Sequence, residues 1–277
     1  MLLHAVTLGC AVDLRAPRAG RVHSVFARAV NLAVDGDLWT AFACDHPDSP
    51  FGLRLAAPSL APLQELRAGD PVHIRAGHLG LGPYVIDGRC AARWAPRRWR
   101  PPASGLDQRL AAVELGSSRR AWPGSADLAR DLTRALQCHG PQAGQPLCEA
   151  VRRSLGCGPG LTPAGDDVLV GLLAMLGNGV AGATGVRTVA RLTDALAPWL
   201  HTTTELSRHL IAQAARGLPG RALHDLGQAL VEGAAPDTLD HALATVMATG
   251  ATSGADACVG LAAGCRLLFP AAERLAA

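Results

Sequence analysis

The sequence contains no lysine, so all 26 of its basic residues are arginine. This absence excludes a Schiff-base lysine, a Walker-type phosphate lysine and a lysine general base. A bound phosphate or carboxylate must therefore be held by Arg side chains, backbone N–H groups and helix ends. Genomic base composition accounts for the bias itself, because Ala, Gly and Pro are abundant too. Lysine-dependent chemistry is excluded whatever the cause of the bias.

Aromatic residues are also scarce, at 4% of 277 residues. Single-stranded nucleic-acid platforms depend on stacked aromatic side chains, and a formal net charge of +3 does not by itself suggest polyanion binding. We therefore expect no nucleic-acid partner. Apolar residues make up 49% and charged residues 18% of the chain, which is a globular composition.

The eight cysteines form no C-x-x-C pair, and the N-terminus lacks the charged region of a signal peptide. These features predict reduced, mostly buried thiols in a cytoplasmic protein. Val168 to Val186 carries no charge, but glycines and Asn178 interrupt it. We expect a buried helix ending near Gly177, followed by a loop, and no membrane partner.

The first part of the chain has the pattern of short strands separated by turns. Asp35-Gly36 and Asp87-Gly88 supply turn residues. We predict a small β-barrel or sandwich-like domain over residues 1–120, within an α+β fold. The expected strands are Arg21–Phe26, Ala29–Val34, Leu38–Ala43, Val72–Ala76, Tyr84–Ile86 and Ala111–Leu115.

The pattern becomes helical from about Ser125, which predicts an all-helical domain over residues 121–277. A segment rich in Arg and Pro, from Arg93 to Gly105, comes before it and has two interpretations. It is either a solvated linker or a docking surface for an acidic partner. The expected helices are Asp127–Cys138, Leu147–Leu155, Pro163–Leu176, Val186–Leu200, Thr204–Arg216, Gly220–Glu232, Thr238–Ala248 and Gly254–Phe269.

A glycine-rich turn that opens a helix runs from Gly156 to Asp167 and reads Gly-Cys-Gly-Pro-Gly-Leu-Thr-Pro-Ala-Gly-Asp-Asp. Thr162 suits the N-cap, and Asp166 and Asp167 fall in the first turn. Gly158 and Gly160 leave backbone N–H groups approachable, so the segment suits an anion. A capped helix without a ligand is the alternative. The spacing matches neither a Walker loop nor a dinucleotide fingerprint.

A second segment, Gly250 to Asp256, repeats this design, with Thr252 or Ser253 as the cap. Asp167 and Asp256 each precede a Gly-Leu pair by one helical turn, so each Asp shares a helix face with a glycine. The glycines by themselves indicate a packing seam. Two helix starts of this kind suggest a convergent pocket. Mg²⁺ is a candidate cofactor of such a carboxylate pair, although no compact multi-carboxylate motif is present.

Together these residues resemble the AllH-type family. The similarity lies in the glycine turn, in Gly-Ala-Thr-Ser-Gly-Ala-Asp near the end, and in Val22 to Leu32, and it extends over both expected domains. The family includes a subunit of the oxamate carbamoyltransferase of bacterial allantoin breakdown. The resemblance implies a subunit of a hetero-oligomer that interconverts oxalurate and phosphate with oxamate and carbamoyl phosphate.

Under this resemblance, backbone N–H groups at Gly158 and Gly160, with Thr162, would hold phosphate. Asp166, Asp167 and Asp256 would orient the carbamoyl amine or a metal. Arg28 and Arg208 are candidate partners of a substrate carboxylate, and Thr252 and Ser253 complete the expected site. The Ser-Thr-Arg-Thr type phosphate loop of other transcarbamoylases is absent. Two alternatives remain, a non-catalytic assembly subunit and a Mg²⁺-dependent hydrolase of a phosphorylated or ribosylated small molecule.

Overall fold

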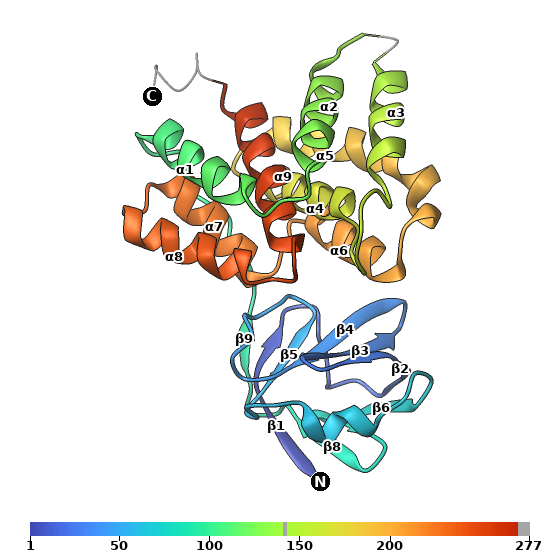
Figure 1. Cartoon of the computed structure of the whole chain (residues 1–277). Helices are drawn as coiled ribbons and strands as arrows, with labels where there is room; N and C mark the ends of the chain where they lie inside the picture. Colours follow the sequence, from blue (N-terminus) through green and yellow to red (C-terminus); the bar gives the residue numbers. More distant parts are fainter. Residues whose placement is uncertain (141–142, 271–277) are drawn as a thin grey trace. The chain divides into compact units, whose positions relative to one another are not determined.

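The computed structural model describes residues 1–140 and 143–270, and the chain divides into two compact units, Met1–Pro96 and Arg97–Ala277. The first unit is a β-barrel and the second is helical (Figure 1). This confirms the expected α+β class and the order of its parts. The boundary that the sequence suggested, near residue 120, lies inside the second unit.

The barrel consists of eight strands in the ring order β5-β4-β3-β2-β6-β7-β8-β1, closed by antiparallel pairing of β1 with β5. A short strand, β9, pairs in parallel with the far end of β1. A 3-10 helix, η1 (Ala61–Glu65), follows β5. The strands are β1 Leu2–Gly9, β2 Arg18–Phe26, β3 Ala29–Val34, β4 Asp37–Phe42, β5 Gly52–Leu55, β6 Pro71–Arg75, β7 His78–Leu81, β8 Tyr84–Asp87 and β9 Ala92–Trp94.

Buried apolar residues on the strands and turn residues between them explain why these segments form β-hairpins. Asp35 and Gly36 have φ of 51° and 85°, as the two-residue turn between β3 and β4 requires. Val30, Leu32 and Trp39 are buried on these strands and contribute to the barrel core. The strands β1, β5, β7 and β9 were not expected, because each is short or lacks clear alternation.

The helical unit contains nine α-helices among its described residues and one further 3-10 helix, η2 (Ala197–Thr202). The helices are α1 Leu106–Ser118, α2 Ser125–Gln137, α3 Gly144–Ser154, α4 Ala164–Gly177, α5 Gly182–Leu196, α6 Glu205–Ala215, α7 Arg221–Glu232, α8 Pro236–Met247 and α9 Ser253–Leu268. The strand expected at Ala111–Leu115 is wrong. It lies within α1, whose buried Leu106, Leu110 and Val113 recur at helical spacing.

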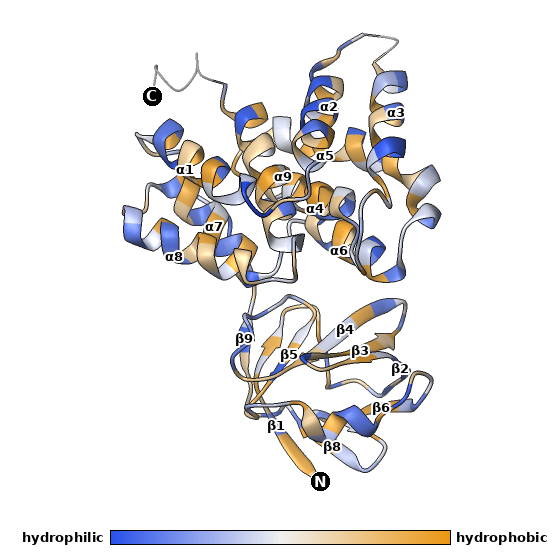
Figure 2. Ribbon diagram, viewed as in Figure 1, coloured by the Kyte–Doolittle hydropathy of each residue, from blue (hydrophilic) through white to orange (hydrophobic). Residues whose placement is uncertain are grey.

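Helices α4 and α9 pack against each other and form the centre of this unit (Figure 1). An added Cβ on Gly171 would lie 1.9 Å from the backbone oxygen of Ala257, and one on Gly260 would lie 1.9 Å from that of Val168. The two backbones therefore touch at reciprocal glycines, which confirms the predicted packing seam. The ribbon of α4 is largely hydrophobic in colour, while α2 shows polar and apolar sides (Figure 2).

The segment after Arg97 is held on the helical unit and is not a solvated linker. Arg97 donates to both carboxylate oxygens of Glu232, at 2.9 and 2.7 Å. Trp99 is buried, and its backbone N–H donates to Asn178 Oδ1 at 2.6 Å. Arg97 is thus already paired with an acid of its own chain, which weakens its expected role in docking an acidic partner.

Two further expectations concern membranes and thiols. None of the helices in the described part of the chain is both long and apolar enough to cross a membrane. The stretch from Val168 to Val186 is divided between α4, a turn and the start of α5, as predicted. The expectation of mostly buried cysteines is wrong, because only Cys258 and Cys265 are buried and five of the eight are exposed.

Candidate functional site

The glycine turn folds back over the start of α4. Gly158 and Gly160 have φ of 98° and 108°, a region that favours glycine. An added Cβ on Gly158 would lie 2.8 Å from the Ala164 Cβ, so the backbone of the turn approaches the helix closely. The carbonyl of Cys157 accepts a hydrogen bond from the Gly165 N–H at 2.9 Å. The turn therefore packs closely over the N-terminal end of α4.

The predicted N-cap at Thr162 is wrong. Helix α4 begins at Ala164 with Pro163 at the N-cap and no side-chain cap, because the Thr162 hydroxyl points to a carboxylate instead. The N–H groups of Asp166 and Asp167 both donate to the Pro163 carbonyl. Within residues 1–140 and 143–270, the N–H groups of Gly158, Gly160 and Thr162 have no hydrogen-bond acceptor. These are the donors that the turn still offers to an anion.

Asp167 connects the starts of α4 and α9. The Thr162 hydroxyl donates to Asp167 Oδ2 at 3.1 Å and lies 3.0 Å from the Ser253 hydroxyl. Ser253, the first residue of α9, also hydrogen-bonds Asp167. The structure thus brings together Thr162, Asp167 and Ser253 from the two segments that the sequence paired.

The Asp167 side chain is only 6% exposed, and its environment favours the protonated form. Burial above all, together with the charges of Asp256 and Asp166, raises the pKa of Asp167 to about 8. Hydrogen bonds from Ser253 and Thr162 act in the opposite direction. Asp167 therefore holds a proton at neutral pH and can exchange it near that pH, as a general acid or base must.

Asp166 has a different role, because its carboxylate binds two backbone segments together. Gly156 N–H donates to its Oδ1 at 2.8 Å, and the Thr203 hydroxyl donates to its Oδ2. Arg208 on α6 donates to the Thr203 carbonyl at 3.0 Å. Asp166 is 1% exposed and both of its oxygens are satisfied. It thereby orders the glycine turn.

Asp256 holds the loop between α1 and α2. Its Oδ1 accepts from the Trp122 N–H at 2.8 Å and from the Ser125 hydroxyl at 2.7 Å. Its Oδ2 is buried without a hydrogen-bond partner in the described chain. The charge of Asp256 also raises the pKa of Asp167. Buried oxygens are normally paired, so an Oδ2 atom without a partner is unusual.

Thr252, Thr204 and Arg28 each have a different position in the structure. Thr252 occupies the N-cap position of α9 but makes no side-chain cap bond. Thr204 caps α6 by accepting from the Ser207 N–H at 3.1 Å. Arg28 lies in the barrel, between β2 and β3, and pairs with Asp45 at 2.8 Å.

Sequence reasoning missed Thr203, Trp122 and Ser125. Thr203 lies in a run of three threonines, and residue type does not distinguish it from Thr202 and Thr204. The Trp122 contact is made by a backbone N–H, which no side-chain pattern reveals. Among the described residues, no group of three or more His, Cys, Asp or Glu side chains is placed to hold a metal ion.

Comparison with known families identifies both units. The model described as oxamate carbamoyltransferase subunit AllH matches residues 154–265, which include the glycine turn and the start of α9. The model of the AllH family N-terminal domain matches residues 6–93, nearly the whole barrel. No solved structure matches the chain. Because the two family models together span most of the sequence, this protein belongs to the AllH family.

Proposed function

We propose that this chain is a subunit of an oxamate carbamoyltransferase-type enzyme and contributes the anion and proton site at the starts of α4 and α9. The observation that carries the proposal is the bridge from Thr162 and Asp167 to Ser253. It puts a carboxyl group with a raised pKa beside the glycine turn, in which the N–H groups of Gly158, Gly160 and Thr162 have no acceptor among the described residues. The family's printed name, oxamate carbamoyltransferase subunit, supports the reaction class and a multi-subunit assembly.

The N–H groups of Gly158, Gly160 and Thr162 would hold the phosphate. In the direction of carbamoyl phosphate formation, a phosphate oxygen attacks the carbamoyl carbon of oxalurate. The bond from that carbon to the oxamate nitrogen then breaks. The departing nitrogen needs a proton, and protonated Asp167 would supply it.

The hydroxyls beside Asp167 complete the proton balance. The proton lost from the phosphate hydroxyl would return to Asp167 through Thr162 or Ser253. The free Oδ2 of Asp256 is available to accept a hydrogen bond from the carbamoyl amine. Arg208 remains a candidate for the oxamate carboxylate, together with residues of partner subunits. Arg28, Thr252, Mg²⁺ and a cytoplasmic location stay predictions.

The decisive experiment separates binding from chemistry in the assembled enzyme. Phosphate, carbamoyl phosphate and oxamate are titrated by calorimetry with partner subunits present, with and without Mg²⁺. Oxalurate-dependent formation of carbamoyl phosphate is measured in parallel. We expect Asp167→Asn to bind phosphate but to lose about 100-fold or more in kcat, because the amide cannot donate the acidic proton.

Two controls accompany this variant. Asp237→Asn changes an exposed Asp in the first turn of α8 and should leave kcat unchanged. For wild type, kcat in this direction should fall as pH rises through about 8, where Asp167 loses its proton. No heat from any of the three ligands, or full activity in Asp167→Asn, would remove the proposal.

The assembly-subunit alternative keeps part of its support. Asp166 and Asp256 both use oxygens to order backbone segments, as structural carboxylates do. Gly171 and Gly260 are not available to a partner subunit, because each packs against the other helix of the same chain.

A further inference from the structure

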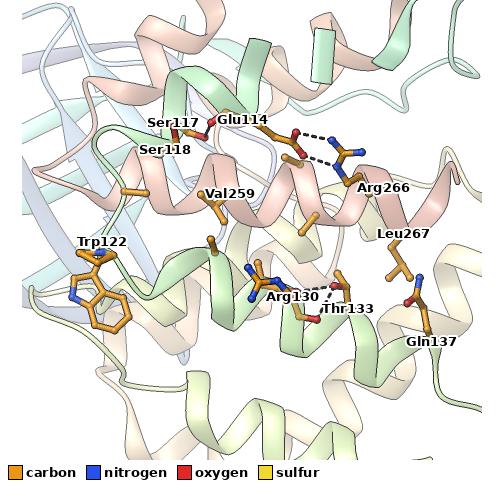
Figure 3. Close-up of a pocket in the computed structure, with 16 residues that line it drawn as sticks. Glu114, Ser117, Ser118, Trp122, Arg130, Thr133, Gln137, Val259, Arg266 and Leu267 are labelled. Atoms are coloured by element: carbon orange, nitrogen blue, oxygen red, sulfur yellow. Dashed lines mark hydrogen bonds and ion pairs between the residues drawn. The ribbon is translucent and has the colours of Figure 1, made fainter. Parts of the chain in front are cut away.

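A pocket of about 560 Å³ lies between α1, α2 and α9 in the helical unit (Figure 3). On α9 its lining includes Val259, Ala263 and Arg266. Asp167, Asp256 and Gly260 are not among the lining residues, although Trp122, whose N–H binds Asp256, is one of them. The pocket therefore adjoins the carboxylate site through Trp122 but does not include its carboxylates.

Small side chains line the pocket where α2 and α9 face each other. Ala126 and Ala129 come from α2, while Ala262 and Ala263 come from α9. Protein interiors are normally filled by larger side chains at such a junction. A volume of about 560 Å³ falls within the range of small-molecule sites, which are mostly apolar with a few polar groups. The lining therefore suits the apolar body of a compact molecule.

The walls of the pocket are fixed without a ligand. Arg266 donates to both oxygens of Glu114 at 2.6 Å, joining α9 to α1 (Figure 3). The loop that carries Trp122 is held by the bond from its N–H to Asp256. The Trp122 ring lies directly over Gly124, where an added Cβ would be 1.9 Å from a ring atom. A preformed pocket of this kind loses little conformational freedom when it binds.

Charge indicates which kind of molecule fits. The Glu114 carboxylate already neutralises Arg266, whereas Arg130 lines the pocket and pairs with Asp127 of its own helix. Asp127 is 70% exposed, and an exposed pair of this type is weak. The Arg130 guanidinium is thus available to a ligand anion, with Thr133 and Gln137 as neighbouring polar groups.

We infer that this pocket is a binding site for a compact apolar molecule with a single anionic group. The apolar body lies over the alanines of α2 and α9, and the anion faces Arg130. The site does not depend on the proposed transferase chemistry, because none of its lining residues takes part in that chemistry.

The test compares three probes of equal chain length and different charge, octanoate, octan-1-ol and octylammonium, by calorimetry on the full chain. We expect octanoate to bind with one site per chain and octylammonium to bind at least about tenfold more weakly. Arg130→Ala should weaken octanoate but not octanol. Arg134→Ala, on the same helix and outside the pocket, is the matched control.

The second part of the test fills the pocket with a larger side chain. Ala263→Phe should weaken octanoate by about tenfold or more, while Ala112→Phe at an exposed position of α1 should not. Thermal melting checks that both variants are folded. The inference fails if octanoate does not bind, if Ala263→Phe binds it normally, or if octylammonium binds equally well. It also fails if only the elution volume changes in Ala263→Phe, because the pocket would then be an interface between copies.

Discussion

Asp167 and Asp256 each occupy the first turns of a central helix, one turn before a glycine at which the two helices touch. Their surroundings differ in one respect. Asp167 faces two half-buried hydroxyls beside a glycine turn with free N–H groups, whereas Asp256 binds a backbone N–H and a buried hydroxyl. The same short motif thus provides a carboxyl group with a raised pKa at one helix start and a loop anchor at the other. A repeated motif does not imply a repeated role.

Substitution of the contact glycine should have the same effect on stability in both helices. It is also the largest effect that we expect. Gly171→Ala and Gly260→Ala should each lower the free energy of unfolding by about 3 kcal/mol or more, because the added Cβ would meet a backbone oxygen. Gly144→Ala, at the open start of α3, should change it by less than about 1 kcal/mol. Chemical denaturation measures all three. Similar stabilities for the three variants would contradict the close approach of α4 and α9.

Removal of each carboxylate should have a different effect on stability at the two helix starts. Asp256→Ala leaves the Trp122 N–H and the Ser125 hydroxyl without an acceptor, so we expect a loss of about 2–4 kcal/mol. Asp167→Ala should lose less, because the Thr162 and Ser253 hydroxyls can bond each other and water. Urea unfolding compares the two variants with Asp237→Ala at an exposed site. A larger loss for Asp167→Ala would reverse the assignment of roles.

The raised pKa of Asp167 predicts a pH dependence of stability. Between about pH 4 and pH 8 the folded chain holds a proton on Asp167 that the unfolded chain releases. The free energy of unfolding should therefore fall as pH rises across this window, by up to about 1.4 kcal/mol per pH unit from this group. Asp167→Asn removes the contribution, so its stability should decline less than that of wild type between pH 5 and pH 7.5. Parallel curves for the two proteins would contradict the raised pKa.

Helix capping gives the smallest effect. Thr204→Ala removes the only side-chain cap bond found at the start of a described α-helix, and should lower the free energy of unfolding by about 1 kcal/mol. Thr252→Ala should change it by less than about 0.5 kcal/mol, because Thr252 makes no cap bond. Urea denaturation at one pH resolves the difference. A cost for Thr252→Ala equal to that for Thr204→Ala would show that the α9 start is capped in solution.

The order of a β-rich unit and a helical unit was predictable because hydrophobic periodicity is a local property. Helices such as α4 and α7 were found close to their observed bounds, whereas α1 was mistaken for a strand over Ala111–Leu115. Five residues sample too little of the helical period to distinguish the two. The closing pair of the barrel, β1 with β5, joins segments distant in the chain, and no local pattern reveals it.

The sequence by itself determined which chemistry is available: no lysine, two helix starts with Asp one turn before Gly, and a glycine turn with donors to spare. Only the tertiary structure decided how the surroundings of the two Asp side chains differ. Asp167 and Asp256 have the same spacing to the following Gly-Leu pair. A pKa, however, depends on burial and neighbouring charges, and those come from other segments. The same holds for the α1–α2–α9 pocket, which exists only where three helices meet.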